Sequence, residues 1–297
     1  MLKIPSFAFA LAFGAASSAL AQLIPFGLTT PQPPFANPYT CFSAHIKVGP
    51  SDGSCFFLKS SNSIYLVTAR HVLFNDKSSP TNWPPWSNTA ECNYFTNETD
   101  PPASLLLDLA CLISSRELRY STNHDFALIR VEQLDPTNRD RGTLLTGISV
   151  SPVTPANTGT GPSSFDYSAN TKPFQETGVG SDVFLFGFPS SLGLPQMPQI
   201  DPNLPLLRKG IVAGKNLKRR VLILDCPSYQ GNSGGPVVTR ETTSAYTKYI
   251  VLGVVTEWIP FSESWLNSRF PYNNTTLSNS GYSIAEPIDL AIQMFWN

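Results

Sequence analysis

The sequence predicts an all-β protein built from two small β-barrels, and three observations favour this class. The chain of 297 residues contains 27 prolines and 19 glycines but only 14% charged residues, which is typical of short strands and many turns. Short runs of β-branched and aromatic residues recur along it. Residues 151–177, rich in Ser, Thr, Pro, Gly and Asn, separate two β-rich halves of similar size and are predicted to be a linker.

The N-terminal segment has the features of an exported protein. Residues 1–21 resemble a secretory signal peptide, with an apolar run after Lys3 and the small-x-small sequence Ala19-Leu20-Ala21. A membrane anchor is the alternative, but the run is shorter than the ~20 residues that a span needs. We therefore expect secretion (extracellular or periplasmic) without a membrane anchor in the mature form. Residues 22–40 are predicted to be an extended, Pro-rich lead-in.

Residues 41–150 are predicted to form the N-terminal barrel. Residues 75–103 are loop-like, and Leu105–Ile113 is either a buried strand or a short helix, because periodicity does not choose between them. The expected strands are Ala44–Val48, Cys55–Leu58, Ser63–Thr68 and Phe126–Val131.

Residues 178–297 are predicted to form the C-terminal barrel and to end in a short helix over Ile288–Trp296. Residues 190–206 are a Pro-rich loop. The expected strands are Asp182–Phe188, Gly210–Ala213, Val221–Leu224, Pro236–Thr239 and Tyr249–Thr256.

Charge and metal-binding patterns exclude several classes of partner. The formal net charge is −1 and the 20 basic residues are scattered, so we expect neither nucleic acid nor an anionic membrane as a partner. The chain has no C-x-x-C motif and its three histidines are isolated, so we expect no metal and no cofactor. We expect a monomer.

Five cysteines lie in the predicted mature part, and an oxidising compartment would permit disulfides among them. Because five is odd, at least one is free or pairs with another chain. The locally favoured pairs are Cys41–Cys55 and Cys92–Cys111, which leave Cys226, but many other pairings are open.

The stretch from Gln230 to Val238 places a single Ser233 in a glycine-dense turn directly before a predicted strand. A Ser hydroxyl is a weak nucleophile that needs a neighbouring base, and its attack on a carbonyl creates an oxyanion that backbone N–H groups stabilise. Gly231 and Ser233 are candidates for those N–H groups. An ordinary Gly-Pro turn is the alternative if this motif stands alone.

His71 and Asp125 complete a candidate catalytic set. His71 follows a predicted strand, and an imidazole is the usual general base near neutral pH. Asp125 directly precedes a buried strand, where it could accept a hydrogen bond from the imidazole and fix its tautomer. Each could instead be structural: His71 as a histidine at a strand end and Asp125 as the cap of a turn. Together they run His71, Asp125, Ser233 at spacings of 54 and 108 residues, across both halves, which predicts a site in a cleft between two barrels.

These three stretches resemble motifs of the chymotrypsin-fold (trypsin-like) serine peptidases. Thr68-Ala69-Arg70-His71 is similar to their Thr-Ala-x-His, Asp125-Phe126-Ala127-Leu128 to their Asp-Ile-Ala-Leu, and Gly231–Pro236 to their Gly-Asp-Ser-Gly-Gly-Pro. The likeness covers about residues 41–297, and the order of the three residues is that of this family.

The resemblance implies two six-stranded antiparallel β-barrels and a serine-type endopeptidase that hydrolyses protein or peptide substrates. By this likeness Ser233 is the nucleophile, His71 the general base and then acid, and Asp125 the residue that orients His71. The backbone N–H groups of Gly231 and Ser233 form the oxyanion hole, and catalysis passes through an acyl-enzyme intermediate.

The departures from the family pattern are informative. Asn232 replaces the Asp that pairs with a released N-terminus in trypsin-type zymogens, which predicts no such activation; the HtrA (Deg) branch also carries Asn here. Val72 replaces the Cys often found beside the catalytic His. Only 64 residues follow Ser233, which leaves no room for a PDZ domain.

Four residues are candidates for substrate contacts. Pro227 occupies the position where trypsin carries the carboxylate that selects Lys or Arg, so that preference lacks its usual basis. Thr256, Glu257 and Trp258 resemble the strand that lines the substrate cleft: Trp258 would narrow the primary pocket and Glu257 would favour a nearby basic side chain. The alternative is that both simply face solvent or core.

Two other functions compete with the peptidase. A catalytically silent binding protein of the same fold is one, since fold does not fix function, although a binding module does not need all three residues. An esterase or other acyl hydrolase using the same triad is the second.

Overall fold

The structure is a computed structural model that describes residues 42–75, 83–95, 102–138, 142–151, 162–190, 197, 199–243, 247–267 and 272–294. The predicted signal peptide, the Pro-rich lead-in and Cys41 lie outside these residues. Within them the chain is mostly β-strand with a few short helices, which confirms the predicted all-β class.

The N-terminal half forms one ten-stranded sheet, ordered β6-β7-β3-β2-β1-β4-β5-β9, in which β8 also pairs with β7 and β10 with β2. More than the predicted six strands are present because four short ones, β6, β8, β9 and β10, are added to six longer ones. The strands are β1 (Ala44–Val48), β2 (Ser51–Lys59), β3 (Ser63–Thr68), β4 (Thr89–Tyr94), β5 (Ala103–Asp108), β6 (Leu118–Tyr120), β7 (Ala127–Leu134), β8 (Gly142–Leu144), β9 (Ile148–Ser151) and β10 (Ser164–Asp166).

The C-terminal half forms a closed barrel of six antiparallel strands, as predicted, ordered β11-β12-β13-β16-β15-β14. The strands are β11 (Asp182–Gly187), β12 (Leu206–Asn216), β13 (Val221–Asp225), β14 (Pro236–Thr242), β15 (Thr247–Asn267) and β16 (Tyr272–Pro287).

Each half has its own apolar core. In the N-terminal sheet the buried side chains include Ile46, Leu66 and Leu105, and in the C-terminal barrel they include Leu185, Leu224 and Val237. Burial of such side chains contributes roughly 1.5–3 kcal/mol each, so each half provides a packed platform for the loops above it.

The helices are short. They are α1 (Arg70–Leu73), α2 (Leu109–Ser114), α3 (Tyr167–Asn170), the 3-10 helix η3 (Phe174–Glu176) and α4 (Asp289–Gln293). The segment predicted as either strand or helix is both, since β5 runs directly into α2. The predicted C-terminal helix is present as the small α4. No helix in the described ranges has the length and apolarity needed to cross a bilayer.

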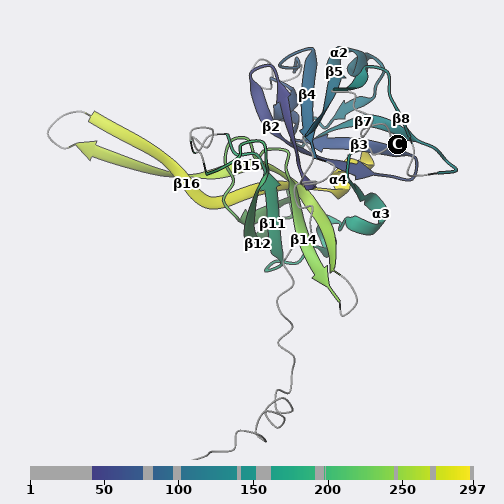
Figure 1. Cartoon of the computed structure of the whole chain (residues 1–297). Coiled ribbons are helices and arrows are strands. Elements are labelled where there is room, and N and C mark those ends of the chain that lie inside the picture. Colours follow the sequence, from purple (N-terminus) through teal and green to yellow (C-terminus); the bar gives the residue numbers. More distant parts are fainter. Residues whose placement is uncertain are drawn as a thin grey trace, which may run out of the picture. The chain divides into compact units, whose positions relative to one another are not determined.

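Two regions carry more structure than their composition suggests. In the predicted linker, β10 pairs in parallel with β2, and Thr171 forms a bridge to Val251 of β15. The hairpin of β15 and β16 continues past the barrel: from Pro260 to Asn267, β15 pairs only with β16. Figure 1 shows this part of the hairpin reaching beyond the other strands of its barrel.

The expected Cys92–Cys111 disulfide is wrong. Cys55, Cys92, Cys111 and Cys226 are all free thiols. Cys92 of β4 and Cys55 of β2 lie on either side of β1, with their Sγ atoms 3.4 Å apart in the core. Cys111 is on α2 instead, with its Sγ 3.9 Å from the Thr146 carbonyl oxygen. The expected Cys41–Cys55 pair is also not formed at Cys55.

Candidate active site

His71 and Asp125 lie together although 54 residues separate them. The Asp125 Oδ2 is 2.5 Å from His71 Nδ1, and its Oδ1 accepts a hydrogen bond of 3.0 Å from the His71 backbone N–H. The carboxylate therefore contacts the side chain and the backbone of one residue at once. This geometry fixes the imidazole with Nδ1 facing the acid and leaves Nε2 on the opposite side of the ring.

The charge on Asp125 is favoured by its surroundings. Burial raises the pKa of this carboxyl, but the side-chain hydrogen bond to His71, the charge of His71, the His71 backbone N–H and the charge of Arg70 together outweigh it. The net result is a pKa below the ordinary value of 3.8. Near neutral pH the acid is ionised and can stabilise an imidazolium beside it.

The helix α1 that carries His71 is anchored to the N-terminal sheet. Its residues Val72 and Leu73 are fully buried, which faces His71 away from the core. The His71 carbonyl oxygen accepts a hydrogen bond of 2.9 Å from Trp86 Nε1. The last residue of β3, Thr68, donates from Oγ1 to the Ser54 carbonyl at 2.8 Å. The imidazole thus sits on a short rigid element.

The turn that carries Ser233 packs against this same region. The Ser233 carbonyl accepts a hydrogen bond of 2.8 Å from the Ser54 N–H. The Gly234 N–H donates a hydrogen bond of 2.7 Å to the Val255 carbonyl. Gly234 has a φ of 90°, and a Cβ there would overlap Ser54 O and Thr68 Oγ1. Only glycine allows this close approach, which places Ser233 beside the strand end that leads into His71.

Gly231, a candidate oxyanion-hole residue, has a backbone conformation that favours glycine. Its φ is 92°, and the Gln230 carbonyl accepts a hydrogen bond of 2.9 Å from the Ser190 N–H. In a trans peptide the carbonyl and the N–H point in opposite directions, so the Gly231 N–H faces away from Ser190. Within the described part of the chain, neither this N–H nor that of Ser233 donates to another residue.

Asn232 is used inside the turn. Its side chain is 1% exposed, and its Oδ1 accepts a hydrogen bond of 3.0 Å from the Tyr229 N–H. Its own backbone N–H donates 2.9 Å to the Tyr229 carbonyl. These two bonds close a local loop, so the turn is held without a charged partner at this position.

The predicted specificity residues surround Ser233 to different degrees. The Ser233 hydroxyl donates a hydrogen bond of 3.4 Å to the Thr256 carbonyl, so Thr256 contacts Ser233 directly. Trp258 pairs with Ser283 of β16, whose Oγ donates 2.8 Å to the Cys226 carbonyl, next to Pro227. Trp258 and the Pro227 segment therefore both adjoin Ser283. Glu257 is exposed and pairs with Ile284, without a polar contact to the other site residues.

A buried acid beside Asp125 was not predicted. Glu286 of β16 accepts hydrogen bonds from His124 Nδ1 at 2.9 Å and from the Asp125 N–H at 3.3 Å. Some 161 residues separate it from Asp125, and no sequence motif marks it. The only signal is His124 itself, a titratable residue next to the predicted acid.

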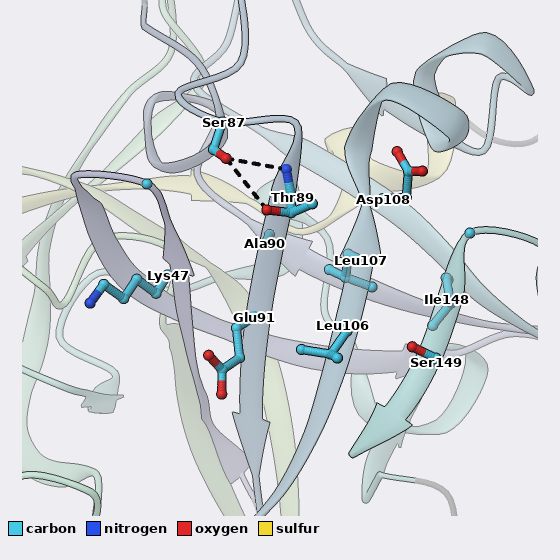
Figure 2. A pocket seen from close by; sticks show the side chains of 12 residues that line it. Lys47, Ser87, Thr89, Ala90, Glu91, Leu106, Leu107, Asp108, Ile148 and Ser149 are labelled. Carbon is cyan, nitrogen blue, oxygen red and sulfur yellow. Dashed lines mark hydrogen bonds between the residues drawn. The ribbon is translucent and has the colours of Figure 1, made fainter. Parts of the chain in front are cut away.

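His71, Asp125 and Ser233 line neither of two cavities formed by described residues. The larger, about 820 Å³, lies over β4, β5 and β9, where Glu91, Leu106 and Ser149 form one row across the sheet (Figure 2). The smaller, about 180 Å³, is lined by Phe188 and Ser190 and so adjoins the Ser233 turn. Among the described residues, no group of three or more His, Cys, Asp or Glu could hold a metal ion.

Comparison with known proteins identifies the family. A trypsin-like peptidase domain matches residues 53–243, which is more than half of the chain. The chain therefore belongs to the trypsin-like peptidase family. No curated protein matches it.

Solved structures similar to this chain include two proteases. One is the HtrA-type protease AlgW with a tripeptide, at 15% identity and a TM-score of 0.45, covering 86% of this chain and 58% of that one. The other is the serine endoprotease from Yersinia pestis, at 15% identity and a TM-score of 0.42, covering 86% and 61%. This chain thus spans about three fifths of their length, and the family assignment rests on the matched domain.

Proposed function

We propose that this chain is a secreted endopeptidase in which Ser233, His71 and Asp125 act as a catalytic triad. The observation that carries the proposal is the pair of hydrogen bonds that the Asp125 carboxylate accepts from His71, with the Ser233 turn packed on the strand end beside it. A structural Asp that merely caps a turn would not need both oxygens on one imidazole-bearing residue.

In the proposed reaction each group acts once during acylation and once during deacylation. His71 Nε2 takes the proton from Ser233 Oγ as the oxygen attacks the scissile carbonyl carbon, and Asp125 stabilises the imidazolium that forms. The Gly231 and Ser233 N–H groups bind the oxyanion, each worth ~3–4 kcal/mol of barrier. His71 then protonates the leaving amine, which gives the acyl-enzyme, and water repeats the sequence to release the acid.

A label and a substrate test this proposal together. A fluorophosphonate should label the purified chain, and the chain should hydrolyse casein. Ser233→Ala should abolish labelling and lower kcat by about 10⁶-fold, as expected when a triad nucleophile is removed. Ser190→Ala is a matched control, because Ser190 lies near the turn but has no catalytic role in the proposal. Equal turnover by Ser233→Ala would contradict it.

The same experiment separates the two competing functions. A folded chain that neither labels nor cleaves casein would be a silent, binding-only member of the fold. A chain that labels and hydrolyses esters but no peptide would be an acyl hydrolase. The endopeptidase is favoured because the family match concerns a peptidase domain.

Activity without a new N-terminus is part of the proposal. Asn232 is neutral and its oxygen is already bonded to the Tyr229 N–H, so a released N-terminal amine has no carboxylate to pair with here. The test is to compare chains that begin at different residues of the lead-in. Activity that appears only after one defined cleavage would contradict this part.

For specificity, we propose that Pro227, Thr256, Glu257 and Trp258 line the substrate cleft, with Trp258 narrowing the primary pocket. Support comes from Ser283, which adjoins both Trp258 and the Pro227 segment. A peptide-library profile of Trp258→Ala should show larger P1 side chains accepted. An unchanged profile would remove Trp258 from the pocket. We also propose that the chain acts as a monomer.

A further inference from the structure

Glu286 is a buried acid for which the triad has no direct use. Its residue is 6% exposed, and both carboxylate oxygens are engaged, one by the Asp125 N–H and one by His124 Nδ1. Burial and the charge of Asp125 raise the pKa of this carboxyl, while the charge of His124 and the two hydrogen bonds lower it, and the net pKa is raised. A buried acid is costly unless it is hydrogen-bonded, and here both oxygens have partners on the segment that carries Asp125.

Glu286 holds one edge of the peptide that carries Asp125. The carbonyl of that peptide, on His124, accepts hydrogen bonds from Arg70 Nη1 at 3.1 Å and from the Phe126 N–H at 2.9 Å. Its N–H, on Asp125, donates to Glu286 Oε1 at 3.3 Å. The peptide is therefore hydrogen-bonded at both edges, which restrains the backbone from which the Asp125 side chain extends.

The same strand pair also reaches the nucleophile turn. Glu286 pairs with Val254 across β15 and β16, and the next residue of β15, Val255, accepts from the Gly234 N–H at 2.7 Å. The Val255 N–H in turn donates 3.0 Å to the Gly235 carbonyl. Two adjacent residue pairs of β15 and β16 thus contact both parts of the site: Glu286 of one pair contacts Asp125, and Val255 of the next contacts the Ser233 turn.

We infer that Glu286 is a positioning residue: it fixes the Asp125 peptide and so holds the Asp125 carboxylate on His71 in register with Ser233. This inference rests on the proposed function of the triad. It assigns to the C-terminal barrel a part in orienting the acid that the N-terminal sheet supplies. Glu286 acts through Asp125 and does not touch substrate.

Two conservative variants separate positioning from simple charge. Glu286→Gln keeps the side-chain length and an oxygen for the Asp125 N–H but removes the charge. Glu286→Asp keeps the charge but withdraws the carboxylate by one methylene. Because a displacement of about 1 Å can cost ~100-fold in rate, we expect Glu286→Asp to lower kcat by about 10–100-fold, with Glu286→Gln within about 3-fold of wild type. KM should be unchanged in both.

The control is Glu241→Gln, which neutralises an exposed acid on β14 that pairs with Lys172. It should match wild type. If Glu286→Asp retains the wild-type kcat, or exceeds Glu286→Gln, the positioning role is overturned. The role would also be overturned if both variants lost kcat equally and in proportion to a fall in melting temperature. Such a result would indicate a purely structural contact between the two halves.

A second readout does not depend on turnover. The proton on His71 Nδ1 should give a low-field NMR signal that disappears in Asp125→Asn. Glu286→Asp should shift or broaden that signal, whereas Glu286→Gln should preserve it. An inactive wild type with this pattern would contradict the proposed function alone, and an unchanged signal in Glu286→Asp would contradict the positioning role alone.

Discussion

In the N-terminal sheet the candidate catalytic residues are joined by side chains, whereas in the C-terminal barrel the Ser233 turn is held mainly by backbone groups, with the Asn232 amide and the Ser54 hydroxyl as additional side-chain partners. Asp125 reaches His71 through its carboxylate oxygens, and His124 reaches Glu286 through its imidazole. The turn instead relies on the Ser54, Gly234 and Val255 backbone groups and on positive φ at Gly231 and Gly234. Substitutions in the two halves should therefore lower activity in different ways.

This difference follows from what each half supplies. Proton transfer needs titratable side chains whose pKa values and tautomers are set by neighbours. Oxyanion binding needs backbone N–H groups at fixed positions, which only the path of the chain can provide. Conservative changes of side chains are the sharpest way to alter the first half, and added Cβ atoms are the sharpest way to alter the second.

Among the substitutions that compare the two halves, the largest effect is expected from Asp125→Asn. The amide keeps the size of the side chain but favours the wrong imidazole tautomer, and we expect kcat to fall by about 10⁴-fold with KM nearly unchanged. Steady-state kinetics on a peptide substrate measure this. Asp182→Asn, at an exposed acid paired with Lys209, is the control and should retain full activity. A loss below tenfold for Asp125→Asn would show that the acid does not orient His71.

A smaller loss is expected from Gly231→Ala in the C-terminal barrel. A Cβ there would overlap Phe188 O, so the peptide that presents the N–H must move. We expect kcat to fall by about 10²–10³-fold, the usual cost of one oxyanion donor.

Gly180→Ala is the matched control, because Gly180 also has a positive φ, of 86°, but open space around its Cβ position. It tests the cost of the backbone conformation without a collision. Equal kcat losses in the two variants would place the effect in general strain and not in the oxyanion hole.

How much of this could be read from the sequence depends on the kind of signal. The bounds of β1 and β3 match the prediction, since both alternate or are rich in β-branched residues. The strand β4 was assigned to a loop because prolines crowd its flanks. Most of β16 was missed because it is polar, and its outer part is exposed, which removes the alternation that marks a half-buried strand.

The candidate site divides in the same manner. His71, Asp125 and Ser233 could be predicted because each lies in a short local motif at a strand end. Glu286 could not, because its contact with Asp125 depends on how β16 closes the barrel, and no local pattern encodes that pairing. The disulfide expectation failed for a similar reason: Cys55 and Cys92 are neighbours across β1, not along the chain.

The pH dependence of stability should reflect the side-chain contacts of the N-terminal sheet. The pKa of Asp125 is lowered from 3.8 in the folded state, so the stability from its ionised form is present above that value. It is lost as the pH falls through the folded pKa. Urea unfolding between about pH 5 and 2 should show the wild type losing more stability than Asp125→Asn. Parallel curves would contradict the shift.

The smallest effect concerns the thiols. Cys55, Cys92 and Cys226 are buried, and burial raises the pKa of Cys226 to about 11 and that of Cys55 well above its usual range. Cys111 is only partly buried. Among these four thiols, iodoacetamide should therefore modify Cys111 first in the native protein, and Cys55, Cys92 and Cys226 only on unfolding. A Cys55 or Cys92 that stays unmodified after unfolding without reductant would contradict the free thiols.

The most direct test of the account is to map the site of fluorophosphonate attachment by peptide mass spectrometry. We predict a single adduct on Ser233, formed in the wild type and at least about 10³-fold more slowly in His71→Ala, because the imidazole must remove the hydroxyl proton. A folded wild type that gives no adduct, or one carried by a different serine, would contradict the triad.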